Sequence, residues 1–218
     1  MNKKFIAELT GTYFLVLIGT GTAVFSDNLI AIALAFGLVV TVLIFSFGNI
    51  SGAHFNPSVT LAMFLNHRIH TADLIHYLLA QFIGATLATA TLALILASNQ
   101  LGTTSLGVTV LGPGVSILGG FLLEFIMTFF FVMIILIASG KNGQPQFAGL
   151  IIGLALITLI LFGASLTGTS LNPARSFGPA IWTGGLALNQ LWLYILAPML
   201  GGAAAAIVCR KLFDTEKI

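Results

Sequence analysis

Six runs of about 20 apolar residues constrain this chain more than any other feature of its sequence. They cover residues of about 4–25, 29–49, 71–97, 116–139, 147–166 and 189–210. A helix of about 20 apolar residues is long enough to cross the hydrocarbon core of a bilayer. Only 6% of the 218 residues are charged, whereas soluble domains have about 25%. We therefore expect an all-α membrane protein with six transmembrane helices, whose outer surface faces the lipid bilayer.

Two shorter apolar segments each follow an Asn-Pro pair. The first pair stands in Ser-Gly-Ala-His-Phe-Asn56-Pro57-Ser58, and the second in Thr-Gly-Thr-Ser-Leu-Asn172-Pro173-Ala-Arg-Ser. Asn is a good helix cap, and Pro is favoured at the first helical position, so each motif predicts a loop that enters a helix. The helices, about 57–66 and 173–184, are about 15 Å long at a rise of about 1.5 Å per residue, which is half a bilayer. We therefore expect two re-entrant half-helices.

The two motifs belong to an internal repeat with a spacing of 116 residues, the distance from Asn56 to Asn172. The same spacing relates Glu8 to Glu124, Thr12 to Thr128, Gly37 to Gly153 and Pro57 to Pro173. Each copy contains three spans and one half-helix, so the second copy enters the membrane from the opposite side. The sequence thus predicts a single domain over 1–218 with an inverted repeat: about 1–97 and about 116–218, joined by a loop of about 98–115.

The basic residues indicate the orientation. With six spans, seven of the eight fall on the side that holds both termini: Lys3, Lys4, Arg68, Lys141, Arg210, Lys211 and Lys217. Cytoplasmic loops carry an excess of Lys and Arg, so we expect both termini to be cytoplasmic in a multi-pass protein. Arg175 is the exception. A charge inside a membrane is costly and marks a functional site by default.

The two loops before the Asn-Pro pairs are non-helical backbone at membrane depth. Such backbone is tolerated only where it is buried in protein or lines a water-filled cavity. The carbonyls that we expect along a pore are those of Gly52, Ala53, His54, Gly168, Thr169 and Ser170. Burial of the loops for purely structural reasons is the alternative.

Asn56 and Asn172 can each present an amide N–H to this pore where the two half-helices meet, near the midplane. Both helix dipoles would point their positive ends there, which repels cations and interrupts a chain of water molecules that could pass protons. Glu8 and Glu124 lie within spans, and buried carboxylates need donors. We expect them to support the loops by accepting loop N–H groups; a direct role with a solute or proton is the alternative.

With six spans and an inverted repeat, the motifs Ser51–Ser58 and Asn172-Pro173-Ala174-Arg175 resemble the aquaporin (major intrinsic protein) family over essentially the whole chain. The resemblance implies a single channel domain and a homotetramer with one pore in each subunit. The first motif has Ser58 where the family usually has Ala. Because Ser is also small, we expect the turn to survive.

The resemblance also places a selectivity filter at Phe36, Ile160, Thr169 and Arg175. Phe36 and Thr169 are typical of water channels, but strict water channels usually carry His where Ile160 stands. Ser176 and Ala180 stand where glycerol channels usually have Asp and a basic residue. The chain is thus closer to the water-channel branch than to the glycerol facilitators, with less selectivity against small neutral solutes.

We therefore expect a passive channel in a prokaryotic inner or cell membrane. It would conduct water, together with some small neutral solutes, and exclude protons and ions. The alternative is a facilitator mainly for glycerol or another small neutral solute such as hydrogen peroxide or ammonia. The sequence has no HExxH motif and no Ser-His pair, so we expect no enzyme, cofactor or metal site, and nothing indicates nucleic acid as a partner.

Overall fold

The computed structural model describes residues 2–102, 105–213 and 215, and these residues form an all-helical bundle. Six helices are long and apolar enough to cross a membrane: α1 (Lys3–Phe25), α2 (Leu29–Ser51), α4 (Thr71–Ser98), α5 (Ile117–Ala138), α6 (Ala148–Thr167) and α8 (Gly185–Phe213). Two short helices, α3 (Pro57–Leu65) and α7 (Pro173–Thr183), follow the Asn-Pro pairs, and a 3-10 turn, η1 (Pro145–Phe147), precedes α6. The predicted six spans and two half-helices are confirmed. Lys217 and part of the predicted 98–115 loop lie outside the described residues.

The last span begins earlier than its hydropathy suggests, at Gly185 instead of about residue 189. Only Gly184 separates α7 from α8. Gly184 and Gly185 have φ angles of +70° and +54°, a left-handed backbone that glycine adopts without steric cost. The chain therefore reverses between α7 and α8 without a polar loop. A polar loop is the sequence signal that would have shown where α8 begins.

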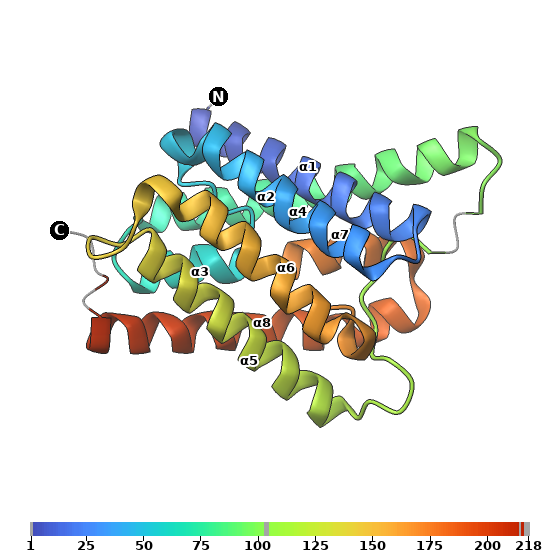
Figure 1. Ribbon diagram of the computed structural model, residues 1–218. Coiled ribbons are helices and arrows are strands. Elements are labelled where there is room, and N and C mark those ends of the chain that lie inside the picture. Colours follow the sequence, from blue (N-terminus) through green and yellow to red (C-terminus); the bar gives the residue numbers. More distant parts are fainter. Residues whose placement is uncertain (1, 103–104, 214, 216–218) are drawn as a thin grey trace.

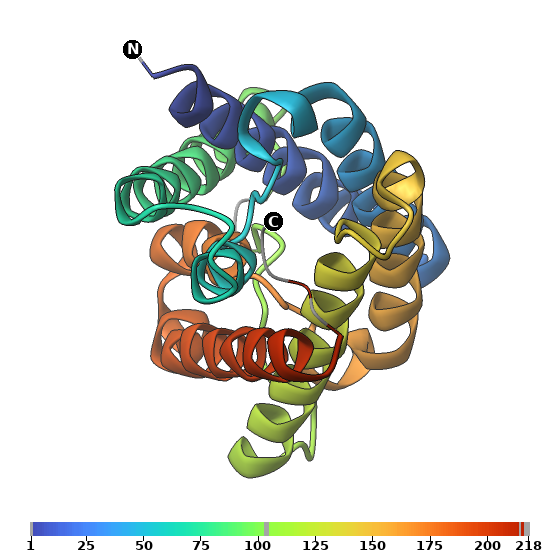
Figure 2. The same ribbon diagram turned by 90° about the vertical axis from the view of Figure 1, so that its left-hand side faces the viewer.

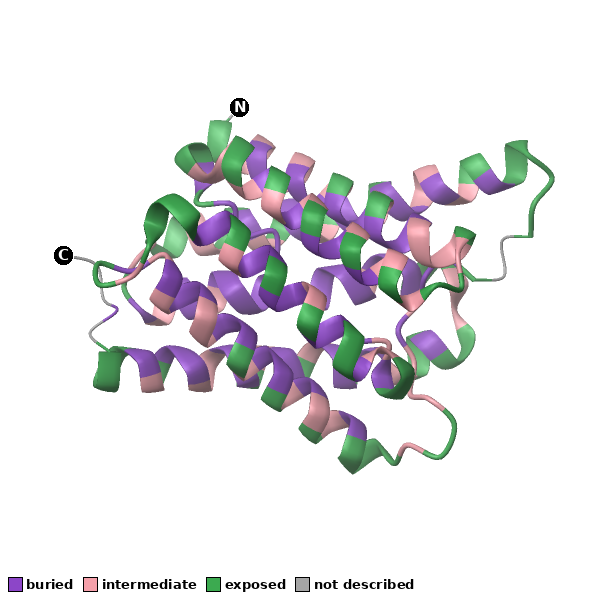
Figure 3. Cartoon of the chain, viewed as in Figure 1, coloured by how far each residue is buried: buried purple, intermediate pink, exposed green. Residues whose placement is uncertain are grey.

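The long helices run roughly side by side in Figure 1, and Figure 2 views the bundle from one end. α1 packs on α4, α5 packs on α8, and α2 packs on α6, while both short helices pack against α4 and α8. Buried residues face the interior and exposed residues face outward (Figure 3). Many of the outward-facing side chains are large and apolar, among them Leu94 and Phe162, as expected for helices surrounded by lipid.

α2 and α6 cross at a pair of glycines that the 116-residue spacing relates. A Cβ atom added to Gly37 would lie 2.5 Å from the carbonyl oxygen of Gly153, and one added to Gly153 would lie 2.5 Å from the carbonyl oxygen of Gly37. Such backbone approach is typical of membrane helices packed through small residues. The reciprocal contact is what a two-fold axis between the helices requires.

The start of α1, the end of α8 and the link between α3 and α4 lie at the same end of the bundle (Figure 1), and these segments carry several basic residues. Lys4 at the start of α1 forms an ion pair with Asp73 at the start of α4, with Nζ and Oδ2 2.7 Å apart. Arg68 donates from Nη1 to Ser139 Oγ (2.9 Å) and from Nε to the carbonyl of Thr215 (2.8 Å). These bonds tie the α3–α4 link to the end of α5 and to the chain beyond α8.

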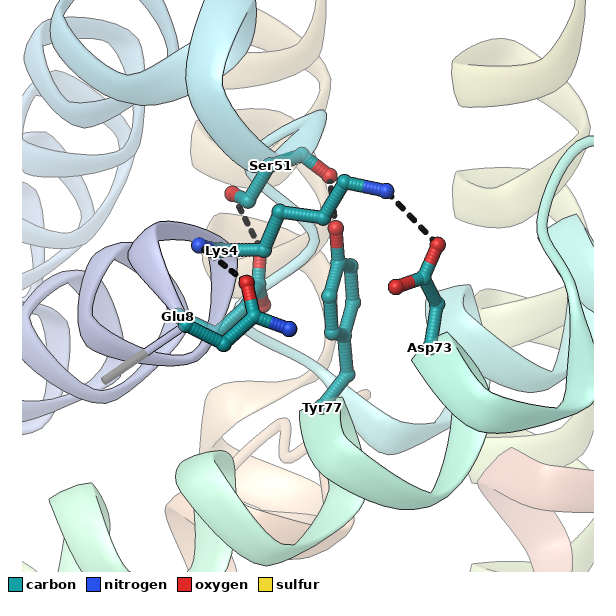
Figure 4. A network of polar contacts seen from close by, with 6 residues as sticks. Lys4, Glu8, Ser51, Asp73 and Tyr77 are labelled. Carbon is teal, nitrogen blue, oxygen red and sulfur yellow. Dashed lines mark hydrogen bonds and ion pairs between the residues drawn. The ribbon is translucent and has the colours of Figure 1, made fainter.

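The first re-entrant loop is held by the carboxylate of Glu8, which is fully buried in α1. One oxygen of this carboxylate accepts from Ser51 Oγ (2.6 Å) and from the backbone N–H of His54 (2.9 Å). The other accepts from the N–H of Phe55 (2.8 Å) and from the side chain of Gln81 (2.8 Å). Figure 4 shows Glu8 beside Ser51, with Lys4 and Asp73 nearby.

The second loop is held in the same way by Glu124 on α5, which is also fully buried. Its carboxylate accepts from Thr167 Oγ1 (2.7 Å) and from the N–H groups of Ser170 (2.9 Å) and Leu171 (3.0 Å). These three donors stand 116 residues after Ser51, His54 and Phe55. A tyrosine hydroxyl also donates a hydrogen bond at the start of each loop: Tyr77 donates to the carbonyl of Ser51, and Tyr194 donates to the carbonyl of Thr167.

The bonds to the carboxylates stabilise an unusual backbone. Ala53 and Phe55 in the first loop have φ angles of +55° and +50°, and Thr169 and Leu171 in the second have +43° and +54°. A left-handed backbone costs a non-glycine residue about 1–2 kcal/mol. Without the carboxylates, the loops would combine this strain with buried N–H groups that have no acceptor.

We expect Glu124→Leu to destabilise the fold, because it leaves two buried N–H groups without an acceptor. Each such group costs about 1–3 kcal/mol, so the Tm should fall by on the order of 10 °C. Thermal unfolding in detergent micelles measures the change. Glu124→Gln is the matched control, because it keeps one acceptor oxygen and should lose less. A Glu124→Leu protein that unfolds at the wild-type temperature would contradict this account of the loops.

Candidate pore

A narrow cavity of about 100 Å³ lies between the two loops and the facing helices. Ala148, Ile152, Leu156 and Ile160 line it from α6 at every fourth position. At about 1.5 Å per residue, this stripe is about 18 Å long. Phe36, Val40 and Ile44 line it from α2 in the same manner. The cavity is therefore elongated along the helices, and most of its wall is apolar.

Asn56 and Asn172 meet in this cavity, at the N-termini of α3 and α7. Each side-chain oxygen caps its own half-helix: Asn56 Oδ1 accepts from the N–H of Ser58 (2.8 Å), and Asn172 Oδ1 from that of Ala174 (3.1 Å). The turn thus forms with Ser58 in the first motif. Pro57 and Pro173 occupy the first helical positions.

Each asparagine also donates a hydrogen bond to the opposite loop. Asn56 Nδ2 donates to the carbonyl of Leu171 (2.7 Å), and Asn172 Nδ2 donates to the carbonyl of Phe55 (2.8 Å). An amide nitrogen carries two hydrogens, so one on each remains for the cavity that both residues line. Sequence reasoning missed these bonds, because any residue type can supply a carbonyl.

Phe36, Ile160, Thr169 and Arg175 all line the same cavity. The Arg175 guanidinium lies 5.0 Å from the centre of the Phe36 ring, within the range of a cation–π contact. Its Nη1 donates to the carbonyl of Gly107 (2.7 Å), and only 5% of Arg175 is exposed. Gly107 lies in the loop that joins the two halves, and the sequence motifs did not indicate that it would contact Arg175.

The hydroxyl of Thr169 is turned away from the cavity. Its Oγ1 is buried and has no hydrogen-bond partner among the described residues. Among Phe36, Ile160, Thr169 and Arg175, which we call the filter ring, only Arg175 therefore offers side-chain donors to the cavity. The ring combines one fixed cation with two apolar side chains.

The predicted carbonyl positions divide into two groups. Gly52, Ala53, His54, Thr169 and Ser170 line the cavity. Gly168 does not line the cavity. It faces Thr109 instead, and a Cβ added to Gly168 would lie 3.3 Å from that residue. The imidazole of His54 is buried, with Nδ1 3.1 Å from Thr60 Oγ1 and the ring 5.0 Å from that of Tyr77. Neither Glu8 nor Glu124 lines the cavity.

The two ends of the cavity differ although the repeat relates them. The residues 116 positions from the filter ring are Ile152, Ile44, Ala53 and Val59, and all four line the cavity. Val59 stands where the other half has Arg175. A charged side chain therefore faces the cavity at one end, and only apolar side chains stand at the equivalent places of the other.

Comparison with known proteins agrees with this architecture. Residues 1–209 match the family model described as Major intrinsic protein. The chain is 48% identical over 216 residues to the glycerol uptake facilitator protein-like 6 of Lactiplantibacillus plantarum, covering 98% of this chain and 99% of that protein. It is 39% identical over 225 residues to aquaporin Z of Bradyrhizobium diazoefficiens, covering 97% and 94%. The crystal structure of the aquaglyceroporin from Plasmodium falciparum superimposes with a TM-score of 0.86 at 25% identity, covering 97% and 96%. The chain therefore belongs to the major intrinsic protein family of membrane channels.

Proposed function

We propose that the protein is a passive channel that conducts water, with some small neutral solutes, and excludes protons and ions. The observation that carries the proposal is the meeting of the Asn56 and Asn172 amides in a narrow cavity whose walls are otherwise mostly apolar. Two donors at this point can bind the oxygen of one water and turn its hydrogens outward. The positive ends of two half-helices add to the barrier against cations.

The carboxylates favour an uncoupled channel over an ion-coupled transporter. A coupled transporter needs groups along the solute path that can bind and release an ion. Glu8 and Glu124 instead accept hydrogen bonds from the loops, Glu8 also from Gln81 on α4, and neither lines the cavity. The charged or titratable side chains that line the cavity in the described part of the chain are those of His54 and Arg175.

The filter ring supports some passage of solutes larger than water. Arg175 can donate to a hydroxyl group, while Phe36 and Ile160 can contact CH groups on the same solute. A facilitator mainly for glycerol is therefore the second candidate, and the similarity to a glycerol uptake facilitator-like protein favours it. Water remains the first candidate, because the cavity is narrow and Ile160 is bulky.

The proposal extends to assembly, repeats and orientation. We place both termini in the cytoplasm of a prokaryotic cell, because several basic residues gather at that end of the bundle. The inverted repeats, about 1–97 and 116–218, are supported by the matching carboxylate networks. The homotetramer rests on the resemblance to the family alone, and cross-linking in membranes would test it.

Stopped-flow light scattering on proteoliposomes tests the choice of solute. We expect rapid shrinkage in a sucrose gradient, far above that of protein-free vesicles, and slow re-swelling in a glycerol gradient. The physical reason is that the cavity is narrow, and the bulky side chain of Ile160 leaves less room for glycerol than for water. Slow water flux combined with rapid glycerol re-swelling would select the second candidate instead.

Ile160→His tests the filter ring. The polar imidazole removes the apolar surface that the CH groups of glycerol could contact, so glycerol flux should fall while water flux persists. Ile160→Val is the matched control, because it stays apolar and becomes smaller, and its glycerol flux should not fall. An increase in glycerol flux in the His variant would show that Ile160 does not belong to the filter.

A further inference from the structure

Gly19 on α1 stands directly behind the Phe36 ring. A Cβ added to Gly19 would lie 2.5 Å from Cζ of that ring and closer still to Cε1 and Cδ1. Arg175 lies 5.0 Å from the centre of the same ring. The ring is therefore confined between the α1 backbone and the guanidinium, and it has this place only because residue 19 has no side chain.

Gly163 on α6 stands in the same relation to Thr169. A Cβ added to Gly163 would lie 2.7 Å from Thr169 Oγ1 and 2.6 Å from Met127 Sδ. The buried hydroxyl of Thr169 thus occupies the space that Gly163 leaves empty. The backbone next to Thr169 is fixed by the bonds from Thr167 and Ser170 to Glu124, so the Thr169 side chain has more freedom to move than its loop.

We propose that Gly19 and Gly163 are positioning residues that set the width of the filter ring and thereby select among small neutral solutes. This inference rests on the proposed function. A methyl group at either position would meet side-chain atoms, which move more readily than backbone. Phe36 and Thr169 both line the cavity, so the displaced side chain has the cavity as its open direction. A narrower ring excludes glycerol before it excludes water.

The direct test is Gly19→Ala, measured for water and glycerol in the same proteoliposomes. We expect the ratio of glycerol to water permeability to fall about fivefold, which corresponds to a barrier about 1 kcal/mol higher for glycerol. Gly163→Ala should shift the ratio in the same direction. Gly21→Ala is the matched control on α1, because its added Cβ would lie 3.8 Å from Leu92 Cδ1, an ordinary van der Waals distance; its ratio should be unchanged.

A rescue experiment separates positioning from general damage. Gly19→Ala combined with Phe36→Leu should recover the glycerol permeability that Gly19→Ala alone loses, because the smaller side chain leaves room for the methyl group. If Gly19→Ala does not fold, this double variant and Gly163→Ala still decide the matter. Equal losses of water and glycerol flux, without rescue, would show a structural role only.

The outcomes also distinguish this inference from the proposed function. A folded Gly19→Ala protein with the wild-type ratio would overturn the inference and leave the channel function intact. A wild-type protein that carries neither water nor glycerol above protein-free vesicles would contradict the proposed function, and the inference would fall with it.

Discussion

Two re-entrant loops donate hydrogen bonds to two buried carboxylates, and these bonds hold the centre of the structure in place. A bilayer supplies no water to satisfy backbone groups, so non-helical backbone at this depth must find its partners within the protein. Glu8 and Glu124 accept the N–H groups of His54, Phe55, Ser170 and Leu171 and hold them in strained, left-handed turns. The loop N–H groups thus find their acceptors on the side away from the cavity. The carbonyl groups of the loops remain available on the side that faces it.

The anchored loops determine where the two half-helices begin. Asn56 and Asn172 cap these helices and also donate to the opposite loop, so each half of the chain fixes the position of the other. The resulting centre combines amide donors with the positive ends of two helices. On either side of it the repeat has diverged, with Arg175 facing the cavity in one half and Val59 in the equivalent place of the other.

The sequence predicts those parts of the structure that depend on composition and local chemistry. The apolar runs predict the spans, and the Asn-Pro pairs predict the half-helices, because caps and hydrophobic length are local properties. The cross-loop bonds of the asparagines and the bond from Arg175 to Gly107 could not be predicted, because their acceptors are backbone carbonyls from distant segments. The sequence also does not predict that Gly19 lies behind Phe36. A glycine shows which side chain fills the space beside it only when the structure is known.

The proposed function requires the centre of the cavity to pass water but not protons. It is tested most directly by measuring both fluxes in one preparation of wild-type proteoliposomes: water by light scattering, and protons by an enclosed pH-sensitive dye under an imposed membrane potential. We predict water permeability well above that of protein-free vesicles and a proton flux equal to theirs. A proton flux that rises together with the water permeability as more protein is incorporated would contradict the account.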